Sequence, residues 1–195
     1  MIDEKKQLRT FLRSHRRNLS PTDVTEKSRR VTERLLAFAP FLQAFTLVLY
    51  NADENEVVTE AIWQAAISRG QAVYYPRITP DKADLEFVRR YPGEKLVLGA
   101  FNILIPPGDD LLLGMQPSDI VLTPGVGFDK KGHRLGRGKG YYDRAFRGVL
   151  ASALRVALAY ELQVVPEIPS GPEDECVQWI VTETQLIDCT AKVEG

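Results

Sequence analysis

The sequence predicts an α/β fold with a mainly parallel sheet. Short apolar runs typical of buried strands alternate along the chain with segments whose apolar residues have helical spacing. The 195 residues are 44% hydrophobic and 26% charged, which provides material for a core and excludes dominant disorder. Because no repeat, low-complexity tract or linker interrupts this pattern, we predict a single domain over residues 1–195.

Two helices open the predicted order. Residues 3–17 form the first, which ends at Asn18 and has a narrow apolar stripe at Leu8, Phe11 and Leu12. A second helix begins at Ser20, a typical N-cap followed by Pro21 and, three residues on, Asp23. We expect Pro40 to stop it.

The remaining elements alternate. Apolar runs bounded by turn residues predict the strands, and Pro76 and Pro124 are expected to end two of them. A helix closed by Gly70 and another beginning near Tyr141 lie between strands, and Trp63 and Trp179 are expected in the core. Residues 80–118 contain many turn signals, so their order is left open. The expected strands are 45–50, 72–75, 85–88, 120–123, 155–160 and 179–182, and the first of these two helices is 59–69.

The net charge of −1 conceals an uneven distribution. Residues 1–34 carry ten basic and five acidic side chains, and residues 129–147 carry seven and two, so each segment has a charge of +5. The rest of the chain therefore totals −11. These two basic segments are either solvated helices or two walls of one anion site.

Targeting and redox signals are weak. The two cysteines, Cys176 and Cys189, match no zinc spacing, and the only histidines are His15 and His133. His133 lies in a basic turn, where we expect it to be exposed. The charged start of the sequence is not typical of a signal peptide, and no apolar run is long enough to span a bilayer. We expect a cytoplasmic protein with reduced thiols and no membrane partner.

Residues 123–144 contain the chemical signal. Six of the chain's 14 glycines fall in this window, which follows a predicted strand and precedes a predicted helix. Ligands bind at such junctions in α/β sheets, and glycines let backbone N–H groups approach an anion. Because Arg134, Arg137 and Lys139 add positive charge, a polyphosphate cradle is our main interpretation. The spacing matches neither a Walker A loop nor Gly-x-Gly-x-x-Gly.

Two other interpretations of this window stay open. It is either a glycine-rich surface loop with solvated charges or an RNA-binding loop flanked by Tyr141 and Tyr142. Asp143 is equally ambiguous. Beside a polyphosphate it is suited to hold Mg²⁺, but it is also suited to pair with Arg144 or to cap the helix.

The same window resembles the signature of the 5-formyltetrahydrofolate cyclo-ligase (methenyltetrahydrofolate synthetase) family. The matching run is Pro124-Gly125-Val126-Gly127-Phe128-Asp129-Lys130-Lys131-Gly132-His133-Arg134-Leu135-Gly136-Arg137-Gly138-Lys139-Gly140-Tyr141-Tyr142-Asp143-Arg144. Lys5–Arg9, Glu56–Thr59, Phe101–Ile103 and Trp179–Glu183 resemble further family segments, so the likeness covers nearly the whole chain. One departure is Glu173-Asp174, where the family often has His-Asp.

The resemblance implies a fold and a reaction. The fold is a single-domain three-layer sandwich with a Rossmann-like, mainly parallel sheet, NagB/RpiA/CoA-transferase-like. The reaction is the cyclisation of 5-formyltetrahydrofolate to 5,10-methenyltetrahydrofolate, driven by ATP and Mg²⁺ through a phosphorylated formyl (iminophosphate) intermediate. It further implies a small-molecule partner that can carry a polyglutamate tail, no nucleic acid, and a monomer.

The resemblance also assigns residues. Arg137 and Lys139 are implied as catalytic, and Asp143 and Asp174 as Mg²⁺ ligands. ATP is implied at Lys5, Lys6, Gln7, Leu8, Arg9, Arg134, Leu135, Gly136, Arg137, Gly138, Lys139, Gly140, Tyr141 and Tyr142. The folate is implied at Arg9, Tyr50, Asn51, Glu56, Phe101, Arg137, Gly138, Lys139, Gly140 and Tyr141.

Two competing hypotheses remain beside the enzyme. One is a nucleotide- or folate-binding protein without turnover, in which the substitution at Glu173 has damaged the site. The other is an RNA-binding module that uses the loop 129–147. Turnover, ATP-dependent stabilisation and salt-sensitive RNA affinity separate the three.

Overall fold

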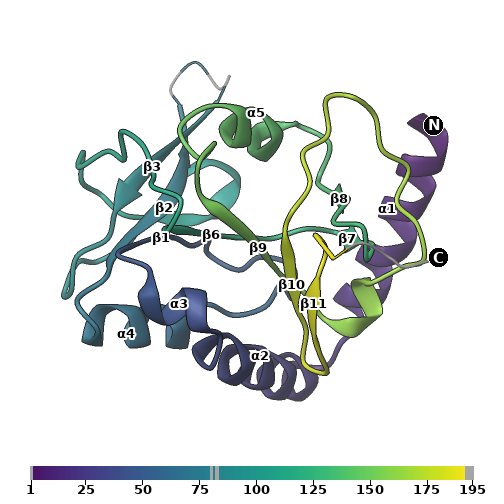
Figure 1. The fold of residues 1–195 in the computed structure, drawn as a ribbon, viewed down its shortest axis with the longest axis horizontal. Helices are drawn as coiled ribbons and strands as arrows, with labels where there is room; N and C mark the ends of the chain where they lie inside the picture. The colour runs from purple at the N-terminus through teal and green to yellow at the C-terminus, as the bar shows by residue number, and fades with distance from the viewer. Residues whose placement is uncertain (1, 80, 82–83, 192–195) are drawn as a thin grey trace.

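The computed structural model describes residues 2–79, 81 and 84–191. Its fold is built around one large sheet. Seven strands lie in the order β11-β10-β9-β6-β1-β2-β3 (Figure 1). Two short hairpins pair β4 with β5 and β7 with β8. The sheet strands are β1 Thr46–Val48, β2 Ala72–Ile78, β3 Leu85–Arg89, β6 Ile120–Thr123, β9 Leu154–Leu158, β10 Trp179–Val181 and β11 Leu186–Asp188. The hairpin strands are β4 Val97–Leu98, β5 Leu104–Ile105, β7 Gly127–Phe128 and β8 Arg134–Leu135.

Helices cover both faces of the sheet. They are α1 Ile2–Arg17, α2 Pro21–Leu36, α3 Ala39–Gln43, α4 Glu60–Ser68 and α5 Tyr141–Arg147, with 3₁₀ turns η1 Ala100–Asn102 and η2 Glu161–Gln163. In Figure 1, α2, α3 and α4 lie on one side of the sheet, α5 lies on the other, and α1 lies beside the β7–β8 hairpin. None of the helices within the described ranges is long and apolar enough to cross a membrane.

The strand directions confirm the predicted fold class. Strands β2, β1, β6, β9 and β10 are mutually parallel, while β3 and β11 pair antiparallel at the two edges. Numbered along the chain, the five parallel strands have the order 2-1-3-4-5. In this doubly wound topology the order reverses between β1 and β6, and ligands bind outside the carboxyl ends of those strands. The topology therefore points to one edge of the sheet.

Side chains along each strand face opposite sides of the sheet in turn, which gives a helical layer on each face. Leu47 of β1 packs with α2, α3 and α4 in the main core, which includes Val31 and Leu35. Its neighbour Val48 faces the opposite side and packs against Phe146 of α5. Successive strand residues point to opposite faces, so both faces are apolar and both are covered.

Several local expectations are confirmed and others are wrong. Ser20 caps α2 in a capping box with Asp23, as predicted. Pro76 does not end β2, because pairing with β1 stops at Tyr74 and a proline is tolerated where a strand has one partner only. Pro40 begins α3 instead of merely stopping α2. Phe11 is 56% exposed and does not belong to the apolar stripe of α1, which packs through Leu8 and Leu12 against Leu135 of the hairpin.

Candidate active site

The candidate site lies at the carboxyl ends of β1 and β6, where the strand order reverses. The chain leaving β1 forms a loop that carries Glu56 before α4 begins. The chain leaving β6 enters the β7–β8 hairpin, and the glycine-rich loop 136–140 then connects β8 to α5. Helix α1 lies beside that hairpin (Figure 1). Segments far apart in the sequence therefore meet at one edge of the sheet.

The glycine-rich loop packs against α1. Gly138 and Gly140 have φ angles of +96° and +67°, a conformation that side-chain-bearing residues rarely adopt. The Nε of Arg9 donates to the carbonyl of Gly136 at 2.7 Å, and a Cβ on Gly138 would lie 3.7 Å from the Arg9 guanidinium carbon. Burial lowers the pKa of Arg9, and the neighbouring Arg13 lowers it further. A bound anion would relieve that repulsion.

Arg137 joins the glycine-rich loop to the loop after β1. Its Nη1 donates to Asp53 at 2.7 Å and its Nη2 to Oε1 of Glu56 at 3.2 Å. Glu56 is 7% exposed. Burial raises the pKa of Glu56, while the positive charges of Arg16 and Arg137 act against that rise. The predicted folate contact and one predicted phosphate contact are therefore neighbours.

The two predicted metal ligands also lie together, each held by a cation. Arg134 donates to Asp143 at 2.8 Å, and the backbone N–H of Glu175 donates to the same oxygen at 3.2 Å. Asp174, adjacent to Glu175, forms an ion pair with Lys5 and accepts the N–H of Gly171 at 2.7 Å. Although burial acts to raise it, the hydrogen bond from Lys5 holds the pKa of Asp174 below its usual value.

The other interpretations of Asp143 are wrong. Arg144 reaches Asp84 at 2.6 Å instead of Asp143. Helix α5 begins after Gly140 and has no side-chain cap. The carboxylate of Asp143 therefore faces the β8 arginine and not its own helix.

The donor set suits magnesium only in part. Within residues 2–79, 81 and 84–191, no cluster of three or more His, Cys, Asp or Glu side chains is arranged to hold a metal. Mg²⁺ is commonly bound through one or two carboxylates plus phosphates and water, and not by an all-protein cage. Asp143 and Asp174 fit that pattern, provided that Arg134 and Lys5 turn toward phosphate.

Other predicted residues have different surroundings. Tyr50 is buried, and its hydroxyl donates to the carbonyl of Val57 at 3.1 Å, so it packs in the core. Phe101 is 68% exposed with a φ of +57° in the turn between β4 and β5. The side-chain amide of Asn51 donates to the carbonyl of Leu104, which ties the same hairpin to the loop after β1.

The residues predicted to bind ATP also differ in their surroundings. Lys6, Gln7 and Lys139 are exposed, and Leu8 and Leu135 pack in an apolar cluster beneath α1. Tyr141 lies under Arg144, with the guanidinium carbon 5.2 Å from the centre of the tyrosine ring. Tyr142 packs against Phe146, and their ring centres are 5.8 Å apart.

Four residues outside the predicted site are also placed. His133 is only half-buried and pairs with the buried Asp129 at 2.8 Å, so the expected exposure is wrong. Trp63 and Trp179 pack against the main core, as predicted. Glu173, which stands where the family often has histidine, forms an ion pair with Arg147.

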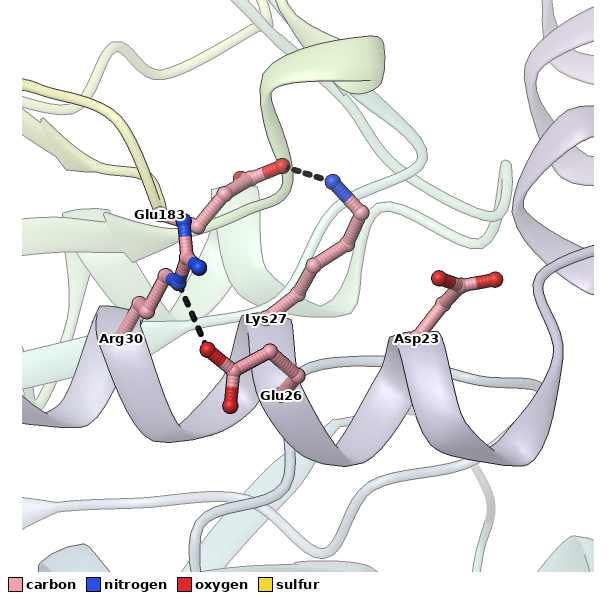
Figure 2. Close-up of a pocket in the computed structure, with 5 residues that line it drawn as sticks. All are labelled: Asp23, Glu26, Lys27, Arg30 and Glu183. Carbon is pink, nitrogen blue, oxygen red and sulfur yellow. Dashed lines mark hydrogen bonds and ion pairs between the residues drawn. The ribbon is translucent and has the colours of Figure 1, made fainter.

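The basic segment 1–34 does not form one wall. In α2, Lys27 pairs with Glu183, and Arg30 donates to Glu26 at 2.8 Å (Figure 2). These side chains line a surface hollow of about 170 Å³ on α2. Because α2 covers the sheet face opposite α5, only the α1 half of this segment reaches the glycine-rich loop (Figure 1).

Sequence reasoning missed Arg16, Glu54 and Asn55. Arg16 is 1% exposed, and Glu54 and Asn55 have positive φ angles in the loop after β1. One signal was present: Arg16 follows Leu8 and Leu12 at four-residue spacing, so an arginine continues the apolar stripe of α1.

The fold and the site together define a class: an α/β protein whose sheet reversal carries a cluster of glycines and arginines, an arrangement that suits an anionic small molecule. Within that class, the chain belongs to the 5-formyltetrahydrofolate cyclo-ligase family, whose sequence profile matches residues 1–183. The family that the motif resembled is thereby confirmed.

Individual relatives agree. The chain is 30% identical over 189 residues to the mouse 5-formyltetrahydrofolate cyclo-ligase, covering 92% of this chain and 93% of that protein. It is 34% identical over 170 residues to the Haemophilus influenzae 5-formyltetrahydrofolate cyclo-ligase, covering 86% and 91%. The NMR structure of Aquifex aeolicus 5,10-methenyltetrahydrofolate synthetase superposes with a TM-score of 0.82 at 29% identity, covering 96% of this chain and 93% of that chain.

Proposed function

We propose that this chain catalyses the ATP- and Mg²⁺-dependent cyclisation of 5-formyltetrahydrofolate to 5,10-methenyltetrahydrofolate, with release of ADP and phosphate. The observation that carries the proposal is the contact of the glycine-rich loop with Arg9 of α1 and, through Arg137, with the buried Glu56. A phosphate site and a site for a polar heterocycle therefore share one arginine. We further propose that the protein acts as a cytoplasmic monomer.

The proposed roles follow from charge. Lys5, Arg9 and Arg134 bind the phosphates of ATP, while Arg137 and Lys139 neutralise the phosphoryl group during its transfer. Phosphoryl transfer depends mainly on such positioning and electrostatic stabilisation and needs no protein nucleophile. Asp143 and Asp174 would hold Mg²⁺, which supplies further neutralisation of the phosphates.

Glu56 is proposed to recognise the pterin. An ionised carboxylate accepts two hydrogen bonds and can pair with adjacent N–H groups of an amino-pyrimidine ring. Arg137 and Arg16 favour the ionised form against the effect of burial.

The proposed chemistry has two steps. The formyl oxygen of the substrate attacks the γ-phosphorus, and the bond from that phosphorus to the ADP oxygen breaks. N10 then attacks the formyl carbon, and inorganic phosphate leaves with the formyl oxygen and takes up the proton that N10 loses. The products are the methenyl cation, ADP and phosphate, so atoms and charge balance.

A direct assay tests this proposal. Purified protein with 5-formyltetrahydrofolate, ATP and Mg²⁺ is expected to develop the near-ultraviolet absorbance of the conjugated methenyl product. Omitting ATP or adding EDTA stops the rise. Thermal stabilisation by ATP without product would indicate a binding protein instead. Affinity for single-stranded RNA that falls steeply with salt and ignores ATP would indicate the RNA-binding module.

A further inference from the structure

Arg16 bridges the two loops that meet at the sheet reversal. Although it is an arginine, it is 1% exposed. Its Nη1 donates to the carbonyl of Gly125, just after β6, at 2.9 Å. Its Nε donates to the carbonyl of Glu54, in the loop after β1, at 3.0 Å. One guanidinium from α1 therefore sets the relative position of both loops.

The third nitrogen of Arg16 faces the predicted folate carboxylate. The buried Nη2 makes no hydrogen bond to any residue that the structure describes. It lies 3.6 Å from Oε1 of Glu56 and 3.8 Å from Oε2 of Glu54. A buried guanidinium without a nearby carboxylate would destabilise the fold strongly. Its position is therefore tied to that of Glu56.

The segment before Glu56 needs such support. Glu54 and Asn55 have φ angles of +50° and +59°. Such left-handed residues are strained and persist only where their surroundings fix them. The amide of Asn55 donates to the carbonyls of Arg16, Arg17 and Leu19 at 3.3, 3.1 and 3.1 Å. The strained turn is therefore docked onto the end of α1.

We propose that Arg16 is a positioning residue that fixes Glu56 for the pterin and thereby sets the affinity for the folate substrate. The identity of the substrate in this inference rests on the proposed function. Its structural basis is the bridge that Arg16 forms between the carbonyls of Gly125 and Glu54. Lysine at this position would keep the charge near Glu56 but has no planar fork to hold both carbonyls. Glutamine would remove the charge as well.

Kinetics test the inference in the complete protein. In Arg16→Gln we expect the KM for 5-formyltetrahydrofolate to rise about tenfold or more, with the KM for ATP changed less than about twofold and kcat retained. Arg16→Lys should recover part of the folate KM. Arg17→Gln is the matched control, because among the described residues the Arg17 side chain bonds only the carboxylate of Glu54, which Arg13 also holds. Equal rises in both KM values, or none, would overturn the inference.

Hydrogen exchange separates this inference from the proposed function. Amides in residues 53–57 and 125–126 should exchange faster in Arg16→Gln, and to a lesser degree in Arg16→Lys, than in Arg17→Gln. If the wild type lacks cyclisation activity, faster exchange in both loops still supports the bridge. Exchange that matches the control in both loops overturns it, even in an active enzyme.

Discussion

Helices α1 and α2 are alike in the sequence and different in the structure. Each has sixteen residues, and both are rich in arginine and lysine. The cations of α1 bind distant groups: Lys5 reaches Asp174, and Arg9 reaches Gly136. Those of α2 include Arg29, which bonds Glu26 and Glu33 on its own helix. Lys27 of α2 also has a distant partner, but that partner, Glu183, follows β10 and does not belong to the glycine-rich loop. A count of charges therefore does not locate an anion site, whereas the place of each cation's partner in the fold does.

The largest expected effect is at the glycine-rich loop that α1 contacts. Lys139→Ala removes a cation that we place on the transferring phosphoryl group, so kcat/KM should fall about 10³-fold or more. Asp143→Asn should cause a comparable loss while still accepting a hydrogen bond from the buried Arg134. The cyclisation assay measures both, and unchanged thermal unfolding is the control. Activity near that of the wild type in either variant would remove that residue from the mechanism.

A second prediction compares the helices directly. Arg9→Gln on α1 should raise the KM for ATP about 10- to 100-fold, because charge-assisted hydrogen bonds contribute about 1.5–3 kcal/mol. Arg30→Gln on α2 makes the same chemical change where the cation pairs with Glu26, and should leave the KM for ATP unchanged. Equal effects in the two variants would contradict the division between the helices.

A third prediction concerns stability and pH. Although burial acts to raise it, hydrogen bonds from Arg13 and Arg17 lower the pKa of Glu54 from 4.5 to about 2. Its ionised form therefore stabilises the fold fully above pH about 4.5, and this stabilisation is lost as the pH falls toward 2. Glu54→Gln should cost about 2 kcal/mol at pH 7, and clearly less at pH 3, in urea unfolding.

The counterpart of Glu54 on α2 provides the control. Hydrogen bonds from Arg29 and Arg30 lower the pKa of Glu26 to about 2 as well. These groups lie on one exposed helix, where ion pairs contribute little. Glu26→Gln should therefore destabilise the protein less than Glu54→Gln at pH 7. A larger loss in Glu26→Gln would reverse the comparison.

The smallest effect is expected at the start of α2. Ser20→Ala removes the N-cap and should lower the free energy of unfolding by about 1 kcal/mol, while both KM values stay at those of the wild type. Ser20→Thr, which keeps a capping hydroxyl, should be close to neutral. A change in KM would show that α2 communicates with the site.

The sequence predicts most of the fold because the relevant signals are local. Apolar runs such as 120–123, the cap at Ser20 and the glycines of the loop act through neighbouring residues, and β6 matches its predicted bounds. The strand β11 and the course of β2 through Pro76 depend on pairing with other strands, which the local pattern does not contain.

The site residues also divide into those that the local motif predicts and those that depend on long-range contacts. The motif places Arg137 and Lys139 in the loop, but the partners of Arg137 lie more than eighty positions earlier in the chain. The burial of Arg16 and the left-handed turn at Glu54 and Asn55 arise only when α1 docks onto the loop after β1. Long-range docking, and not residue type, determines these roles.

The most direct test of the account is the rate of methenyl product formation in three proteins: the wild type, Lys139→Ala and Arg30→Gln. We predict ATP-dependent formation at equal rates in the wild type and Arg30→Gln, and none above background in Lys139→Ala. Product formation in Lys139→Ala at the wild-type rate, or its absence from the wild type, would contradict the assignment of this loop as the active site of a folate cyclo-ligase.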